Sequence, residues 1–323
     1  MSLEYDAAYL DALKAILPKL SKRVPLASVE DIQPSRIGRE ADLVKLYATW
    51  PDSPDIETAV HHVEASDGYQ ISVHSFTKRD VSSSKPGSAI VHYHGGGMIL
   101  GSAEVFAKAL SQLVSWSSVP IFSVNYRLAP EHNGTTPVED CYTALSWLYQ
   151  NAAKHNVNPS RIAVFGESAG GGLAAGVALM ARDRNLQPPL AKQILVYPML
   201  DDRNLIPNEA VEPLAFWKTR DNVIAWTALL GDKAGDPDAD VSPYTAPTRA
   251  KSLADVAPAY IDVGTLDIFR DESIAYATRL MAHNIATELH VYPGLPHAFQ
   301  LIAPEIPATR RAMSNRLSAI LSF

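Results

Sequence analysis

The sequence predicts an α/β fold in which a mostly parallel central sheet carries helices on both faces. From about residue 88, short apolar runs rich in β-branched and aromatic residues alternate with stretches of helical periodicity, which is the pattern of βαβ units. The chain has 323 residues, of which 47% are hydrophobic, so it is long enough to bury a sizeable core. Both observations favour an open, doubly wound sheet.

Six apolar runs are expected to form the strands, with four helices between them. The strands are predicted at residues 89–94, 120–126, 161–166, 192–198, 259–264 and 288–293. The helices are predicted at residues 137–153, 169–183, 271–283 and 304–321. Right-handed crossovers place such helices on both faces of the sheet. Upstream, residues 63–76 predict a hairpin that turns at Asp67 and Gly68 and forms an antiparallel edge.

Two regions interrupt this alternation. Residues 1 to about 50 form a helical segment ahead of the sheet, and residues from 199 to about 250 form an insertion rich in Pro, Asp and Trp. Insertions that follow the carboxyl ends of strands are where α/β folds build lids and substrate pockets. We therefore expect a lid or a pocket wall from the insertion.

Composition disfavours several kinds of partner. A formal charge of −7 argues against binding to nucleic acid or to an anionic membrane surface. No run of about 18 apolar residues occurs, so we expect no membrane span. Cys141 is the only cysteine, which excludes an intramolecular disulfide and fits a reducing compartment. We expect a cytoplasmic protein.

The motifs that bind metals and nucleotide cofactors are missing from the sequence. There is no H-E-x-x-H pair or comparable ligand spacing, which leaves metal-dependent hydrolysis without support. The G-x-G-x-x-G and P-loop patterns are also missing. We expect neither a metal nor a cofactor.

A G-x-S-x-G motif at residues 166–170 places Ser168 between two glycines at the end of an apolar run. This spacing suits a nucleophile elbow, a sharp turn from strand to helix that exposes the serine oxygen. The alternative is that a tight turn merely tolerates a small residue. A base, an acid and a site for a developing oxyanion must be found elsewhere in the chain to favour the catalytic interpretation.

Three glycines, residues 95–97, follow His94 directly after the first predicted strand of the parallel sheet. Such glycines let successive N–H groups aim at one point, as they do in an oxyanion hole. For a glycine run alone, a flexible turn is the alternative. A strand followed by HGGG, and later a strand followed by GxSxG, is far more specific than either motif separately.

An acid and a histidine are expected at the ends of later strands. Asp267 lies in a predicted loop, whereas Asp262 lies within a strand and Asp271 opens the next helix, where a carboxylate complements the helix dipole. His297 lies in a loop bounded by Gly and Pro after the last strand. A loop histidine is often just solvated. Its position after Asp267 completes a Ser…Asp…His order, which favours a catalytic role.

Five motifs occur in order along the chain. They are HGGGM (94–98), YRLAPE (126–131), GESAGGGLA (166–174), DIFRDE (267–272) and PHAF (296–299). With these motifs the chain resembles the hormone-sensitive-lipase-type, bacterial family IV-like esterases of the α/β-hydrolase superfamily over roughly residues 60–320. The resemblance implies the α/β-hydrolase fold with a helical cap. The implied domains are N-terminal cap helices (1–50), a catalytic core (51–198 and 236–323) and a cap insertion (199–235).

The resemblance also implies catalytic roles for three side chains. It makes Ser168 the nucleophile, His297 the general base and then acid, and Asp267 the carboxylate that orients the histidine. Ser168 would attack an ester carbonyl, form a covalent acyl-enzyme and be released by water.

The oxyanion hole and its support follow from the same resemblance. The backbone N–H groups of Gly96, Gly97 and Ala169 would hold the oxyanion, and His94 would support the loop. The family more often has an aromatic residue where Met98 stands and Asp where Glu167 stands. The first difference is expected to reshape the pocket, and the second retains the charge.

The substrate pocket is expected to include Met98, Trp217 and Trp226. The two tryptophans lie on the apolar face of residues 214–230. The alternative for them is that they only attach the cap to the core. A cap over the site favours compact esters over long-chain lipid at an oil surface.

The expected function is that of a serine carboxylesterase acting on small-molecule esters with short-to-medium acyl groups. The same serine chemistry also serves amide or lactone hydrolysis and acyl transfer, and these alternatives stay open. A non-catalytic ligand receptor, such as the related gibberellin receptors, is a further alternative, but there the catalytic histidine is replaced and here His297 is present. The cap tryptophans and the C-terminal helix offer a surface for a homodimer.

Overall fold

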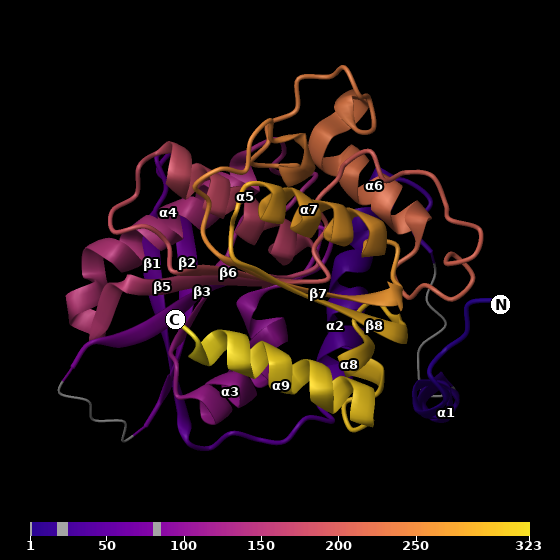
Figure 1. Cartoon of the computed structure of the whole chain (residues 1–323), viewed down its shortest axis with the longest axis horizontal. Helices are drawn as coiled ribbons and strands as arrows, with labels where there is room; N and C mark the ends of the chain where they lie inside the picture. The colour runs from indigo at the N-terminus through magenta and orange to yellow at the C-terminus, as the bar shows by residue number, and fades with distance from the viewer. Residues whose placement is uncertain (1, 18–24, 80–84) are drawn as a thin grey trace.

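The computed structural model describes residues 2–17, 25–79 and 85–323 (Figure 1). An eight-stranded sheet crosses the molecule in the order β1-β2-β4-β3-β5-β6-β7-β8. Its strands are β1 (Ile56–Glu64), β2 (Gln70–Lys78), β3 (Gly87–Tyr93), β4 (Ile121–Asn125), β5 (Val157–Glu167), β6 (Lys192–Val196), β7 (Ala259–Leu266) and β8 (Thr287–Pro296). The pairings of β1 with β2 and of β2 with β4 are antiparallel, and all others are parallel. The prediction of a mostly parallel sheet is confirmed.

The predicted strands and the predicted hairpin are present. The turn between β1 and β2 falls at Asp67, whose carboxylate accepts a hydrogen bond from the N–H of Tyr69 at 3.2 Å. The antiparallel edge forms where the sequence predicts it.

Strand β5 starts earlier than expected, at Val157, because Val157 pairs with Gly87 of β3. The register of this pairing shifts between Gly87 and Ala89.

Helices cover both faces of the sheet (Figure 1). They are α1 (Ala7–Ile16), α2 (Ile32–Tyr47), α3 (Ala103–Ser117), α4 (Thr136–Asn151), α5 (Ala169–Asp183), α6 (Thr219–Leu230), α7 (Arg270–Ala282), α8 (Phe299–Ile302) and α9 (Pro307–Leu321). Helices α4, α5 and α7 lie on one face, and α3 and α9 lie on the other. Each face buries its own apolar cluster. Helix α3 is not among the elements predicted above, although Ser102 caps its first turn by accepting a hydrogen bond from Val105 N–H.

Short 3₁₀ turns occupy Val29–Asp31, Ala152–His155, Gly231–Lys233 and Pro247–Arg249.

Helix α5 packs closely against the backbone around it because glycines stand at its contact points. A Cβ added at Gly170 would lie 1.9 Å from the carbonyl oxygen of Tyr93 on β3. At Gly176 it would lie 2.0 Å from the carbonyl oxygen of Tyr244. Only glycine permits these backbone contacts: the one at Gly170 holds the first turn of α5 against the end of β3, and the one at Gly176 holds the middle of α5 against the loop at Tyr244.

The N-terminal region contributes helices α1 and α2, and the insertion after β6 contributes helix α6. Helix α2 joins the two apolar clusters, since Ile32 belongs to one and Leu46 to the other. An Arg39–Asp221 ion pair, with 3.8 Å between Nη1 and Oδ1, connects α2 to α6. Residues 1 and 18–24 of the predicted N-terminal cap lie outside the described residues. The division into cap and core stays a prediction.

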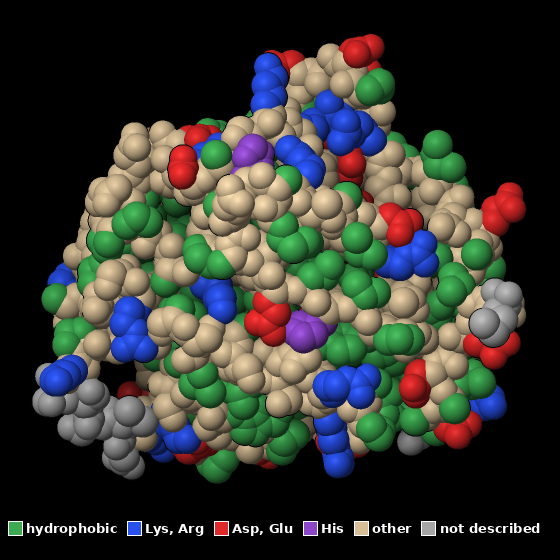
Figure 2. All heavy atoms as spheres, in the orientation of Figure 1, with side chains coloured by type: hydrophobic (Ala, Val, Ile, Leu, Met, Phe, Trp, Pro, Cys, Tyr) green, Lys and Arg blue, Asp and Glu red, His purple; other side chains and the backbone are tan. Residues whose placement is uncertain are grey.

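The surface carries charges of both signs. On the face shown in Figure 2, Lys and Arg side chains are interspersed with Asp and Glu, without a broad basic patch. Within the described ranges, no helix combines the length and the apolar character that crossing a membrane requires.

Candidate active site

The elbow around Ser168 lies between β5, which ends at Glu167, and α5, which begins at Ala169. Ser168 has φ 57° and ψ −122°, a strained conformation for a residue with a side chain. A Cβ added at Gly166 would lie 2.1 Å from the carbonyl oxygen of Gly170, so the turn closes only with glycine there. The strain points the serine hydroxyl into a cavity rather than into the helix.

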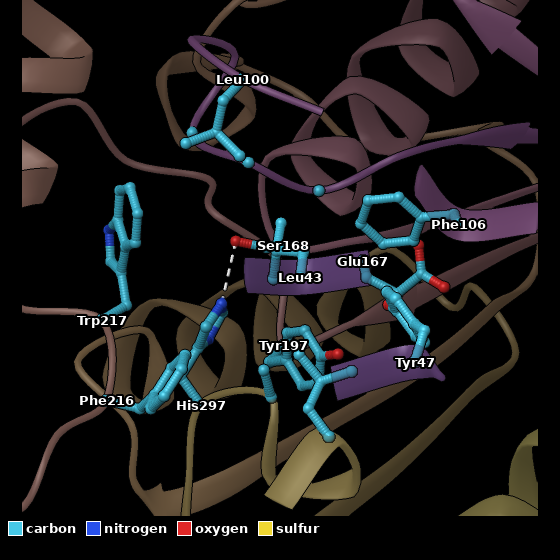
Figure 3. A pocket seen from close by; sticks show the side chains of 15 residues that line it. Leu43, Tyr47, Leu100, Phe106, Glu167, Ser168, Tyr197, Phe216, Trp217 and His297 are labelled. Atoms are coloured by element: carbon cyan, nitrogen blue, oxygen red, sulfur yellow. Dashed lines mark hydrogen bonds between the residues drawn. The ribbon is translucent and has the colours of Figure 1, made fainter. Parts of the chain in front are cut away.

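Three side chains predicted from separate motifs meet at this elbow. The distance from Ser168 Oγ to His297 Nε2 is 3.0 Å (Figure 3). The distance from His297 Nδ1 to Asp267 Oδ2 is 2.7 Å. The other carboxylate oxygen of Asp267 accepts the N–H of Phe269 at 3.0 Å. A carboxylate accepts from Nδ1–H, so Nε2 keeps the lone pair that the serine O–H requires.

Packing around His297 fixes the plane of its ring. The rings of Tyr197 and Phe269 meet it edge-on, with centroids 4.5 and 5.3 Å away. Asp267 and His297 are both buried, at 1% and 5% exposure. Low local polarity strengthens the hydrogen bond between them.

The glycine loop after β3 lies beside Ser168. Gly96 has φ 124° and Gly97 has φ 63°, values that favour glycine. Gly96 O accepts hydrogen bonds from the N–H groups of Ile99 and Leu100, both at 3.1 Å. Gly96 and Gly97 line the same cavity as Ser168.

The amides of this region are available to a ligand. In the described part of the chain, the N–H groups of Gly96, Gly97 and Ala169 have no hydrogen-bond acceptor. Ala169 is the first residue of α5, so its amide adds the positive end of a helix dipole. Such donors suit a developing negative charge on oxygen.

His94 lies under the glycine loop and is fully buried. Its ring stacks on Tyr126 with 4.2 Å between centroids, and Nδ1 lies 3.0 Å from the carbonyl oxygen of Gly95. Burial lowers the pKa of His94 to about 3, so the ring is neutral and Nδ1–H donates to that carbonyl. Tyr126 O–H donates to the carbonyl oxygen of His94 at 2.7 Å. These contacts fit a supporting role for His94.

The cavity at Ser168 is small and mostly apolar, with a volume of about 70 Å³. Its apolar walls come from Leu43, Leu100, Phe106, Phe216, Trp217 and Leu301. Trp217 lies on one side of Ser168, and Phe106 lies on the other with Glu167 and Tyr47 (Figure 3).

Of the three predicted pocket residues, two do not line this cavity. Trp217 lines the cavity, whereas Met98 and Trp226 are not among the described residues that line it. Both are fully buried in the apolar cluster on the α5 side of the sheet, because the turn at Met98 and the inner face of α6 direct these side chains into the core. For Trp226, the alternative interpretation as attachment of the insertion to the core is the better one.

Several lining residues have no counterpart in the sequence predictions. Leu43 and Tyr47 come from α2. They are four residues apart and so lie on one helix face, but this spacing does not indicate what that face packs against. Glu167 lines the cavity beside the nucleophile, and its carboxylate lies 2.8 Å from Nε2 of His92. Across the described ranges, no group of three or more His, Cys, Asp or Glu side chains could hold a metal ion.

Comparison with known proteins identifies the family. Residues 90–301 match a family described as alpha/beta hydrolase fold. The match covers more than half of the chain, so the protein belongs to this family. The fold class expected from the sequence is thereby confirmed.

Several of its relatives are named as esterases or ester hydrolases. Esterase LipI of Mycobacterium tuberculosis is 34% identical over 235 residues, which cover 72% of this chain and 71% of the relative. Ethyl acetate hydrolase of Pseudomonas putida is 28% identical, covering 93% and 92% of the two chains. The solved structure titled Bacterial Heroin Esterase has a TM-score of 0.86 and 32% identity, over 98% of this chain and 97% of that one. The resemblance to esterases of the α/β-hydrolase superfamily is confirmed.

Proposed function

We propose that this protein is a carboxylesterase with Ser168, His297 and Asp267 as its catalytic triad. The observation that carries the proposal is the unbroken hydrogen-bonded chain from Ser168 Oγ through the imidazole to the buried carboxylate, beside an apolar cavity. The relatives named esterases support the same reaction.

Each step of the reaction uses a group already in position. His297 Nε2 takes the proton of Ser168 as its oxygen attacks the ester carbonyl, and Asp267 stabilises the imidazolium that forms. The amides of Gly96, Gly97 and Ala169 hold the tetrahedral oxyanion, and His94 supports the loop that carries the first two. His297 then protonates the leaving alcohol, and water releases the acyl group by the same steps in reverse.

The size of the cavity favours small acyl groups. At roughly 10–15 Å³ for each water molecule, a volume of about 70 Å³ holds only a handful of waters. Acetyl to butyryl groups fit such a space, whereas an octanoyl chain is too long to be enclosed by it. The substrates we propose are therefore soluble esters with short acyl groups.

Hydrolysis of p-nitrophenyl acetate, butyrate and octanoate tests this function. We expect kcat/KM to be highest at the short chains and to fall at octanoate. Ser168→Ala and His297→Ala should each lower kcat by at least about 10³-fold, as removal of a triad member does. Ser117→Ala, at a buried serine on α3, is the matched control and should retain activity.

The proposal fails if the folded wild-type protein hydrolyses none of these esters or if Ser168→Ala retains activity. Faster turnover of the matching p-nitroanilides than of the esters would make the protein an amide hydrolase instead. Two other expectations remain predictions: a cytoplasmic location, supported by the single buried cysteine, and a homodimer, which size-exclusion chromatography with light scattering would detect.

A further inference from the structure

We propose that Arg36 and Glu40 of α2 are positioning residues that hold the oxyanion loop, defined as residues 94–101, in its catalytic shape. Neither residue is among the described residues that line the cavity, and each instead binds the backbone of the loop. This inference rests on the proposed ester hydrolysis, because it assigns both side chains a role in that reaction.

The oxyanion loop has a backbone that needs external support. Four of its residues have positive φ: Gly96 (124°), Gly97 (63°), Met98 (59°) and Gly101 (101°). Strained backbone of this kind persists only where surrounding contacts over-determine it. Some of these contacts come from within the loop, and α2 supplies others.

Glu40 fixes the end of the loop. Its Oε1 accepts the N–H of Gly101 at 2.8 Å. The loop closes on its own start at this point, since a Cβ added at Gly101 would lie 2.6 Å from the carbonyl oxygen of Gly95. A displacement of Gly101 is therefore transmitted to Gly95 and to the adjacent Gly96, which lines the cavity.

Arg36 fixes the middle of the loop. Its Nε donates to the carbonyl oxygen of Ile99 at 2.8 Å, and Nη2 donates to that of Ala129 at 3.1 Å. The N–H of Ala129 in turn donates to the carbonyl oxygen of Met98 at 2.9 Å. One planar guanidinium thus ties α2 to the oxyanion loop and to the segment that braces it.

A carboxylate holds the Arg36 guanidinium in place. Nη1 and Nη2 each lie 2.8 Å from a different carboxylate oxygen of Glu131, a bidentate pair. Hydrogen bonding from Arg36 lowers the pKa of Glu131, so the pair is ionised at neutral pH. Arg36 itself is only 19% exposed, which limits solvent competition for these bonds.

The spacing along α2 relates loop support to the cavity. Arg36, Glu40, Leu43 and Tyr47 follow one another at intervals of four, three and four residues, which places them on one helix face. The first two bind the oxyanion loop, and the last two line the cavity. One helix face therefore sets the position of the oxyanion donors relative to the cavity wall.

Steady-state kinetics on p-nitrophenyl acetate tests the inference with Glu40→Ala and Arg36→Ala. We expect kcat to fall about 10- to 100-fold in each, with KM within about threefold of wild type, because misplaced oxyanion donors weaken transition-state binding. The affinity of a trifluoromethyl ketone, which mimics the tetrahedral intermediate, should fall by the same factor as kcat/KM.

Arg182→Ala is the matched control. Arg182 is 22% exposed and, like Arg36, donates to two loop carbonyls, those of Ser252 and Ala254 at 3.0 Å each, and to one carboxylate. It lies outside the proposed catalytic machinery, so its loss should lower Tm without lowering kcat. Equal losses of kcat in Arg182→Ala and Arg36→Ala would overturn the inference.

Conservative variants separate positioning from folding. Glu40→Gln keeps an oxygen acceptor and should restore kcat to within about threefold of wild type, whereas Arg36→Lys loses the planar fork and should not. If an alanine variant does not fold, kcat and Tm of Arg36→Lys test the inference instead. A lowered kcat with the Tm of wild type supports the inference, and a wild-type kcat overturns it. Wild-type kcat in both alanine variants also overturns it. Absence of esterase activity in the wild-type protein would instead refute the proposed function.

Discussion

One added methyl group at Gly96 should disable ester hydrolysis while leaving the fold intact. In Gly96→Ala the new Cβ would lie 2.1 Å from the carbonyl oxygen of Leu100, and contacts of this kind do not occur below 3.0 Å. Leu100 N–H donates to Gly96 O, so the clash falls inside the turn that shapes the oxyanion loop. The loop must open to accept the methyl group.

The size of the effect follows from that displacement. The loop has to move by about 1 Å, and a misplacement of this size costs about 10²-fold in rate. Loss of one oxyanion donor outright costs about 10²- to 10³-fold in kcat. We therefore expect kcat on p-nitrophenyl acetate to fall by about 10²- to 10³-fold. Backbone strain at φ 124° adds a stability loss of about 1–3 kcal/mol, which a folded domain tolerates.

Gly68→Ala is the control for backbone strain alone. Gly68 has φ 84° in the β1–β2 turn, and a Cβ there would meet no atom within 4 Å. This variant should lose a comparable amount of stability in urea unfolding and keep its kcat. A folded Gly96→Ala protein with kcat within threefold of wild type would refute the assignment of Gly96 to the oxyanion hole.

Two further predictions concern His94 and the tryptophans. Because the folded-state pKa of His94 is about 3 and the unfolded value is about 6.5, the unfolded state binds an extra proton between these pH values. The free energy of unfolding should therefore fall as pH decreases through this window, by up to about 1.4 kcal/mol per pH unit. Urea unfolding of His94→Asn at a series of pH values should show a weaker dependence of this free energy on pH, and an equal dependence in wild type and variant would contradict the assignment. Trp217→Ala should enlarge the cavity and shift the preferred acyl group to longer chains, whereas Trp226→Ala should lower the free energy of unfolding by about 3–5 kcal/mol without changing that preference. A shift in chain-length preference in Trp226→Ala would show that its side chain does reach the cavity.

Much of the fold could be predicted because its signals are local. Strand β6 and helix α5, for example, follow from an apolar run and from helical periodicity in consecutive residues. Helix α3 could also have been predicted, since Ser102 precedes an amphipathic stretch. The early start of β5 could not, because it depends on pairing with Gly87 in a distant part of the chain.

In the candidate site, too, some features follow from neighbouring residues and others depend on distant parts of the chain. Motif order along the chain is enough to predict Ser168, Asp267 and His297, because a nucleophile elbow and the loops after later strands are the places where such groups occur. The three side chains meet because parallel strands bring their carboxyl ends to one edge of the sheet. Leu43 and Tyr47 line the cavity only because α2 packs across that edge. The side chain of Met98, three residues from Gly95, turns into the core through a positive φ that no sequence pattern indicates. Backbone chemistry is encoded by neighbouring residues, whereas the walls of a cavity depend on the packing of the whole chain.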